Sequence, residues 1–121
     1  MAAAKVDHVL GERLERLTGE DADSCVPGYA ALGQAVLRSE GFDAALRRVK
    51  ALADESRLLA ASLLKRRGEL CACEIQAATG LSHATVSHHM AILVESGVVE
   101  ERRRGKWMYY RLARKSPGMI P

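Results

Sequence analysis

The feature that most constrains this chain is a change of hydrophobic period in its last third. Up to that point apolar residues recur every three or four positions, as in Val86, Met90 and Leu93, which is the period of a helix with one buried face. Beyond it, apolar and polar residues alternate through VVEERRRGKWMYYRL, which predicts two strands joined around Arg104-Gly105. A helix followed at once by a hairpin leaves few folds open to this part of the chain.

The helices before the hairpin have recognisable start and stop residues. Asp54 is a candidate N-cap for ESRLLAASLLKRR, whose basic end suits the helix dipole before a glycine stops it. A short helix is expected from about Ala72 to Thr79, and Ser82 should begin a longer one from about His83 to Ser96. The order of helix, short helix, turn, longer helix and hairpin predicts a winged helix-turn-helix, with TGLS as the turn and RRGK as the wing tip.

The N-terminal part of the chain is expected to form a helical extension. Its first helix carries one apolar stripe at helical spacing, formed by Val6, Leu10, Leu14 and Leu17. The stretch EDADSCVPG, residues 20–28, is expected to be a loop because Pro-Gly is a turn signal. Two further helices are expected, one in YAALGQAVLRSE and one in FDAALRRVKAL, residues 42–52.

These elements predict a fold that is mainly α with a small β-hairpin. The chain has 121 residues, 48% of them apolar, with one Phe and one Trp, so its core should be aliphatic and helical. The fold class is a winged helix-turn-helix with an N-terminal helical extension. The expected parts are an N-terminal helical extension and dimerisation region (residues 1–41), a winged helix-turn-helix DNA-binding domain (42–113) and a short C-terminal tail (114–121).

Composition and charge indicate where in the cell the protein is expected and what class of partner it is expected to bind. Charged residues interrupt the N-terminus, and no apolar segment approaches the roughly 20 residues of a membrane span, so neither a signal peptide nor a membrane partner is expected. We therefore expect a cytoplasmic protein with reduced cysteines. Residues 102–115 carry only basic charges, whereas residues 7–23 are rich in acids. A basic stripe is typical of nucleic-acid binding, although a solvated surface explains the charge alone equally well.

The expected recognition helix must bury one face and offer small polar side chains to base edges. With Val86, Met90 and Leu93 inward, its polar residues face outward, and the wing can reach phosphates or the minor groove. For His89 a structural role is as plausible as a DNA contact. The candidate DNA-binding residues are Ser82, His83, Thr85, Ser87, His88, His89, Arg103, Arg104 and Lys106.

Two cysteines, Cys71 and Cys73, lie where the short helix should begin. Inside a regular helix, residues two apart point roughly 200° away from each other. Two thiolates so placed cannot share one ion, because zinc-type metal–sulfur bonds are only about 2.3 Å long. At the helix start, Cys71 as N-cap and Glu74 at N3 have the spacing of a capping box, and the helix dipole should lower the pKa of both thiols. An ion held by both thiols would distort this turn and shift the recognition helix.

Several stretches together resemble the ArsR/SmtB metalloregulatory repressors in order and spacing. They are LADESRLLAASLL, GELCACEI, LSHATVSHHMAILVESGVV and RRRGKWMYYRL, and the resemblance covers about residues 45–113. It implies a dimeric winged-helix repressor of a metal or metalloid resistance operon, released from double-stranded operator DNA by its effector. It also implies that Cys71 and Cys73 are metal ligands.

The sequence departs from that family's pattern in two places. Gln76 stands where arsenic-sensing members often have a third cysteine. The end of the chain, ARKSPGMIP, is not expected to form the final helix that carries the dimer interface and the zinc ligands in many members. A zinc site of that type is therefore not expected, and the homodimer contact is expected over residues 5–18, helped by the helices between Tyr29 and Leu52.

Cys25 is the candidate third metal ligand. It falls in the expected polar loop, where a thiol has no evident packing role, and family members that sense cadmium or lead bring N-terminal cysteines to this site, sometimes from the partner subunit. Three sulfurs suit As(III) or Sb(III), which are the expected effectors; Cd(II) or Pb(II) is the alternative.

Other roles for the cysteines stay open. They can be packing residues or a thiol redox or persulfide switch, and the scaffold can belong to a metallochaperone or thiol enzyme. No nucleophile and base stand at convincing spacing, so we do not expect an enzyme.

Overall fold

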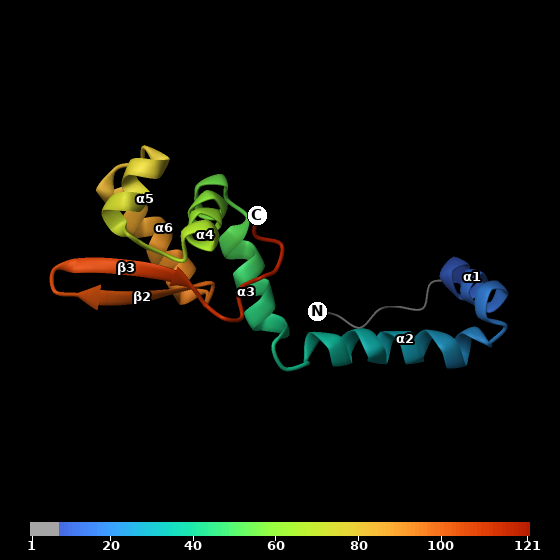
Figure 1. The fold of residues 1–121 in the computed structure, drawn as a ribbon. Coiled ribbons are helices and arrows are strands. Elements are labelled where there is room, and N and C mark those ends of the chain that lie inside the picture. The colour runs from blue at the N-terminus through green and yellow to red at the C-terminus, as the bar shows by residue number, and fades with distance from the viewer. Residues whose placement is uncertain (1–7) are drawn as a thin grey trace. The chain divides into compact units, whose positions relative to one another are not determined.

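The computed structural model describes residues 8–121, and the chain divides into two compact units, Met1–Phe42 and Asp43–Pro121 (Figure 1). The first unit contains α1 (His8–Thr18) and α2 (Ala22–Leu37). The boundary falls at the first residue of α3 (Phe42–Leu52), the helix predicted there. None of the described helices combines the length and the apolar character that a membrane span requires.

The second unit is a winged helix-turn-helix. It continues with α4 (Glu55–Arg67), β1 (Glu69–Cys71), α5 (Ala72–Thr79), α6 (His83–Glu95), β2 (Val99–Arg104) and β3 (Trp107–Leu112). The caps predicted for α4 and α6 are present: Asp54 accepts the backbone N–H of Arg57 at 3.0 Å, and the Ser82 hydroxyl accepts that of Thr85 at 3.2 Å. The predicted fold class is confirmed.

The sheet has one strand more than the predicted hairpin. Its order is β1-β3-β2 with antiparallel pairing throughout, and Cys71 of β1 pairs with Tyr109 of β3. The hairpin itself closes between Arg104 and Trp107, and Gly105 in the turn has a φ of 60°, which a residue with a side chain rarely adopts. β1 thus fastens the start of α5 to the wing.

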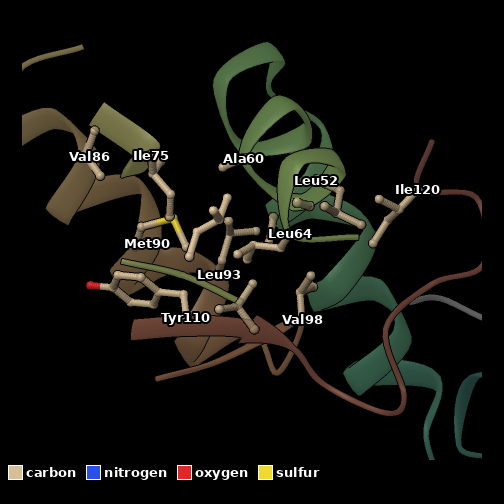
Figure 2. Packing of buried hydrophobic residues seen from close by; sticks show 14 residues of the cluster. Leu52, Ala60, Leu64, Ile75, Val86, Met90, Leu93, Val98, Tyr110 and Ile120 are labelled. Carbon is tan, nitrogen blue, oxygen red and sulfur yellow. The ribbon is translucent and has the colours of Figure 1, made fainter. Parts of the chain in front are cut away.

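The core lies between the sheet and α4, α5 and α6, which gather on one side of the hairpin (Figures 1 and 2). The inward face predicted for α6 is confirmed, because Val86, Met90 and Leu93 are at most 2% exposed. The C-terminal segment also packs here: Ile120 is buried, and its carbonyl accepts a hydrogen bond from Lys65 Nζ at 2.6 Å. The tail therefore covers one end of the core.

The secondary structure of the first unit differs from the prediction. Residues 20–28 were expected to be a loop before a separate helix in YAALGQAVLRSE, but α2 begins at Ala22, continues through Pro27 and contains most of that stretch, ending at Leu37. A proline inside a helix removes one hydrogen bond without necessarily ending it, and the Glu15 carboxylate of α1 accepts the backbone N–H of Ala22 at 2.9 Å. Cys25 is consequently a buried helical residue, only 4% exposed. The apolar stripe of α1 is largely exposed in the described part, and its first member, Val6, lies outside the described residues.

Candidate metalloid and DNA-binding site

The N-terminal half of α6 is a polar, accessible surface. Ser82, His83, Ser87 and His88 are exposed, and Thr85 is half-buried. The buried face of the same helix anchors it in the core, so these side chains project from a rigid support. Small hydroxyl and imidazole groups at a helix start are suited to phosphate oxygens and to base edges in the major groove.

His89 has a different environment from the other predicted DNA contacts. Its side chain is 17% exposed, with Nδ1 3.2 Å from Arg57 Nη1 and 4.0 Å from Asp54 Oδ2. Arg57 Nε also donates to the carbonyl of Ala51 at 2.6 Å, so one guanidinium ties α3, α4 and α6 together. The Arg57 backbone N–H holds the pKa of Asp54 below its ordinary value. His89 is thus engaged in a network that fixes the recognition helix.

The basic residues of the wing are divided between two faces. Arg103 pairs with Met108 and Arg104 with Trp107, so successive side chains on β2 point to opposite sides of the sheet. Arg104 Nη2 lies 3.0 Å from Glu69 Oε1 of β1. Lys106 Nζ lies 5.6 Å from the centre of the Trp107 ring. Arg103 and Lys106 are exposed and remain available to phosphates, whereas Arg104 is paired with Glu69 of β1, on the far side of β3.

Cys71 and Cys73 flank the junction between β1 and α5. Cys71 is the last residue of β1 and the N-cap of α5, and the capping box predicted with Glu74 is present. Glu74 Oε1 accepts the Cys71 backbone N–H at 2.9 Å. Cys71 is half-buried, whereas Cys73 is exposed at a surface depression of about 430 Å³ that Gln76 and Leu81 also line. Both are free thiols.

The acid–base behaviour of Cys71 differs from the prediction. Burial raises the pKa of the Cys71 thiol, and the Glu74 carboxylate acts in the same direction against the lowering effect of the Glu74 backbone N–H. The helix start was expected to lower this pKa, and for Cys71 that expectation is wrong. The pKa of Glu74, in turn, is lowered, first by the hydrogen bond from the Cys71 backbone. Because only the thiolate is a good ligand, occupation of this site should increase as the pH rises.

We expect Glu74→Gln to make Cys71 more reactive. The amide oxygen keeps the hydrogen bond from the Cys71 backbone, while the negative charge that raises the thiol pKa is gone. A lower pKa leaves more thiolate near neutral pH and speeds alkylation. Peptide mass spectrometry after timed iodoacetamide treatment measures the rates of Cys71 and Cys73 separately. A Cys71 rate equal to that of the unmodified protein between pH 7 and pH 9 would contradict this account.

The donor set at the junction fits a soft ion. Two accessible thiols two residues apart at a helix start are ligands of the type that As(III), Sb(III), Cd(II) and Pb(II) prefer. Within residues 8–121, no three His, Cys, Asp or Glu side chains gather closely enough to form a metal site. Cys25 belongs to the first unit, and its participation stays a prediction.

Sequence reasoning missed two residues of this region, Glu69 and Tyr109. Both matter only because β1 pairs with β3, and a strand of three residues has too short a pattern to reveal itself. The net basic charge of the wing predicted Arg104 as a DNA contact. Its acidic partner Glu69 lies on another strand, so the ion pair could not be predicted from the wing sequence.

Comparison with known proteins identifies the family. The family described as "Bacterial regulatory protein, arsR family" matches residues 54–101. The arsenic resistance transcriptional regulator ArsR1 of Pseudomonas putida is 46% identical over 71 residues, which are 59% of this chain and 56% of that protein. The arsenical resistance operon repressor of Escherichia coli is 46% identical over 68 residues, 56% of this chain and 58% of that protein. The chain thus spans little more than half the length of these relatives.

A solved structure agrees with the sequence comparisons. The solution structure of a homodimeric winged helix-turn-helix DNA-binding domain from Mycobacterium bovis, described as a possible ArsR-family transcriptional regulator, is 41% identical with a TM-score of 0.55. The similarity covers 59% of this chain and 65% of that one. The matched segment holds α4, β1, α5 and α6, the elements that carry the thiols and the polar helix start. The chain therefore belongs to the ArsR family of winged helix-turn-helix transcriptional regulators.

Proposed function

We propose that this protein is a metalloid-responsive transcriptional repressor that binds double-stranded operator DNA as a homodimer in the cytoplasm. Its effector is As(III) or Sb(III), alternatively Cd(II) or Pb(II), held by Cys71, Cys73 and Cys25. The observation that carries the proposal is the position of the thiol pair at the first turn of α5, the helix that packs against α6. The arsenic resistance functions named for the two relatives support the choice of effector.

In this proposal α6 enters the major groove with its N-terminal end. Its exposed hydroxyl and imidazole groups contact bases and phosphates, and Arg103 and Lys106 of the wing contact the backbone or the minor groove beside it. His89 and Arg57 hold α6 against α4. The function is that of a DNA-binding module rather than an enzyme.

The response follows from the geometry of the thiol pair. Cys71 is the extended residue just before α5 and Cys73 lies in its first turn, so an ion held by both thiols pulls directly on that turn and distorts it. Ile75, one helical turn after Cys71, is 1% exposed in the core that Met90 and Leu93 of α6 also fill (Figure 2). A displaced first turn therefore changes the support of the recognition helix, and DNA affinity falls.

A gel-shift on the DNA upstream of the protein's own gene tests the proposal. We expect a retarded band that disappears on addition of arsenite or antimonite and persists with Mg²⁺, a hard ion that thiolates bind poorly. In a parallel gel-shift a mild oxidant replaces the metalloid, since a redox switch would release DNA without any metalloid. Persistent binding in arsenite and release by the oxidant would overturn the proposed effector.

The basic side chains of the wing are expected to determine part of the salt dependence of DNA binding. Arg103→Ala or Lys106→Ala should weaken binding to all DNA sequences and reduce the slope of log K against log salt by about one for each lost phosphate contact. Fluorescence anisotropy of labelled DNA over a range of KCl concentrations measures this slope. Arg16→Ala removes the same charge from α1, where Arg16 is 78% exposed, and should leave the slope unchanged. An unaltered slope in both wing variants would remove the wing from the DNA interface.

A further inference from the structure

The face of the sheet that carries Cys71 also carries the acidic anchor of the wing. Directly paired residues of antiparallel strands lie on the same face, and side chains alternate along each strand. Cys71 pairs with Tyr109, and Glu69 lies two residues before Cys71, so all three share one face. Leu70 and Tyr110, which alternate with them, point into the core and are each 7% exposed.

Arg104, the last residue of β2, reaches across β3 to this same face. Its Nη2 lies 3.0 Å from Glu69 Oε1, and its Cζ lies 4.9 Å from the centre of the Tyr109 ring. One side chain at the wing tip is therefore paired with the strand that ends in Cys71 and stacked on the residue that pairs with Cys71. A half-exposed ion pair of this kind adds little to stability. Its effect is to hold the tip of the wing in one position relative to β1.

We propose that Glu69 and Arg104 are positioning residues that couple the thiol pair to the wing. This inference rests on the proposed function, since it takes Cys71 and Cys73 as the effector ligands. Cys71 is both the end of β1 and the N-cap of α5, so an ion that draws Cys71 towards Cys73 acts directly on the end of β1. Glu69 moves with that strand, and Arg104 loses its fixed position.

The coupling gives the effector two routes to the DNA-binding surface. One route passes through α5 to the recognition helix α6, which α5 contacts directly. The other passes through β1 and the Glu69–Arg104 pair to the wing tip, where Arg103 and Lys106 are exposed. Loss of a defined wing position weakens the basic contacts even where the recognition helix keeps its fold.

The accessibility of Trp107 to a quencher measures changes at the wing tip, and this measurement needs no DNA. It is the only tryptophan of the chain, it is 48% exposed, and it is the strand partner of Arg104. Arsenite alone is titrated into the full-length protein, while acrylamide quenching follows Trp107 and a thiol reagent measures the protection of Cys71 and Cys73. In the unmodified protein we expect Trp107 accessibility to change over the arsenite range in which the thiols become protected.

The variants isolate the ion pair from general effects of charge and folding. Glu69→Gln should keep thiol protection at the same arsenite concentrations while losing most of the Trp107 response. Exchange of the pair, Glu69→Arg with Arg104→Glu, should restore the response. Glu101→Gln is the matched control, because exposed Glu101 pairs with Tyr110 and therefore lies on the opposite face of the sheet from Glu69, and it should respond like the unmodified protein.

The outcomes separate this inference from the proposed function. Protected thiols with an unchanged Trp107, or a Glu69→Gln response equal to that of the unmodified protein, would overturn the coupling and leave the proposed effector site intact. Thiols that stay reactive in arsenite would overturn the proposed effector site, and the coupling with it. Loss of the response in both Glu69→Gln and Glu101→Gln would assign the response to net charge rather than to the Glu69–Arg104 pair, and would overturn the coupling.

Discussion

Cys71→Ser and Cys73→Ser are each expected to bind operator DNA like the unmodified protein and to remain bound at arsenite concentrations that release it completely. A serine hydroxyl preserves the size of the side chain and, at residue 71, the capping position of α5. It is not a ligand for a soft ion, because such ions select thiolates. Fluorescence anisotropy on the operator, with and without arsenite or antimonite, measures both properties in one titration.

The controls for this prediction come from the same region. Gln76→Ala changes a neighbouring side chain of the same surface depression without touching a thiol, and it should be released normally. Cys25→Ala should weaken release only in part, since two thiolates still hold the ion. Release of both serine variants at the arsenite concentration that releases the unmodified protein would show that the CxC pair is not the sensor.

Elements with strong local signals could be predicted from the sequence. The bounds of α4, α5 and α6 follow from side-chain caps and helix-ending residues, and the inward face of α6 follows from its period. Asp54 and Ser82 make their capping hydrogen bonds to nearby residues, so no tertiary contact is needed to foresee them. The hairpin was likewise predictable from alternation and from the glycine in its turn.

Features that depend on tertiary contacts could not be predicted. β1 is a strand only because β3 pairs with it, and three residues have no readable period. The start of α2 depends on the Glu15 carboxylate of the preceding helix, which outweighs the turn signal of Pro27-Gly28. The pKa of Cys71 depends on its burial and on the conformation of Glu74, and neither can be read from spacing.

The candidate effector site was predictable in part for the same reason. The thiol pair and the capping box follow from adjacent residues, and both are present. The pairing of Arg104 with Glu69 joins residues from two strands, so the sequence indicated a basic wing without indicating which arginine is held.

Substitution of the exposed leucines of α1 is expected to dissociate the proposed homodimer. Gly11 marks the side of α1 that faces α2, because a Cβ there would lie 3.1 Å from the Ala22 Cβ. Leu10 and Leu17 lie about a quarter to a third of a turn away and are 43% and 81% exposed. An exposed apolar stripe of this kind marks an interface. In a symmetric dimer each leucine occurs twice, so four side chains would leave the interface in Leu10→Glu with Leu17→Glu.

The expected effect is large because complete burial of a leucine contributes about 1.5 to 3 kcal/mol, so burial of the exposed parts of Leu10 and Leu17 contributes about 1 and about 2 kcal/mol in each protomer. The four side chains together correspond to about 6 kcal/mol, which raises the dimer dissociation constant by about four orders of magnitude. Operator affinity should fall with it, since a single winged helix reads only one half-site. Sedimentation equilibrium at micromolar concentration measures the assembly, with Leu59→Glu on α4, 42% exposed, as the matched control. A Leu10→Glu, Leu17→Glu protein that stays dimeric would place the interface elsewhere and would remove the reason to expect Cys25 from the partner subunit at the thiol pair.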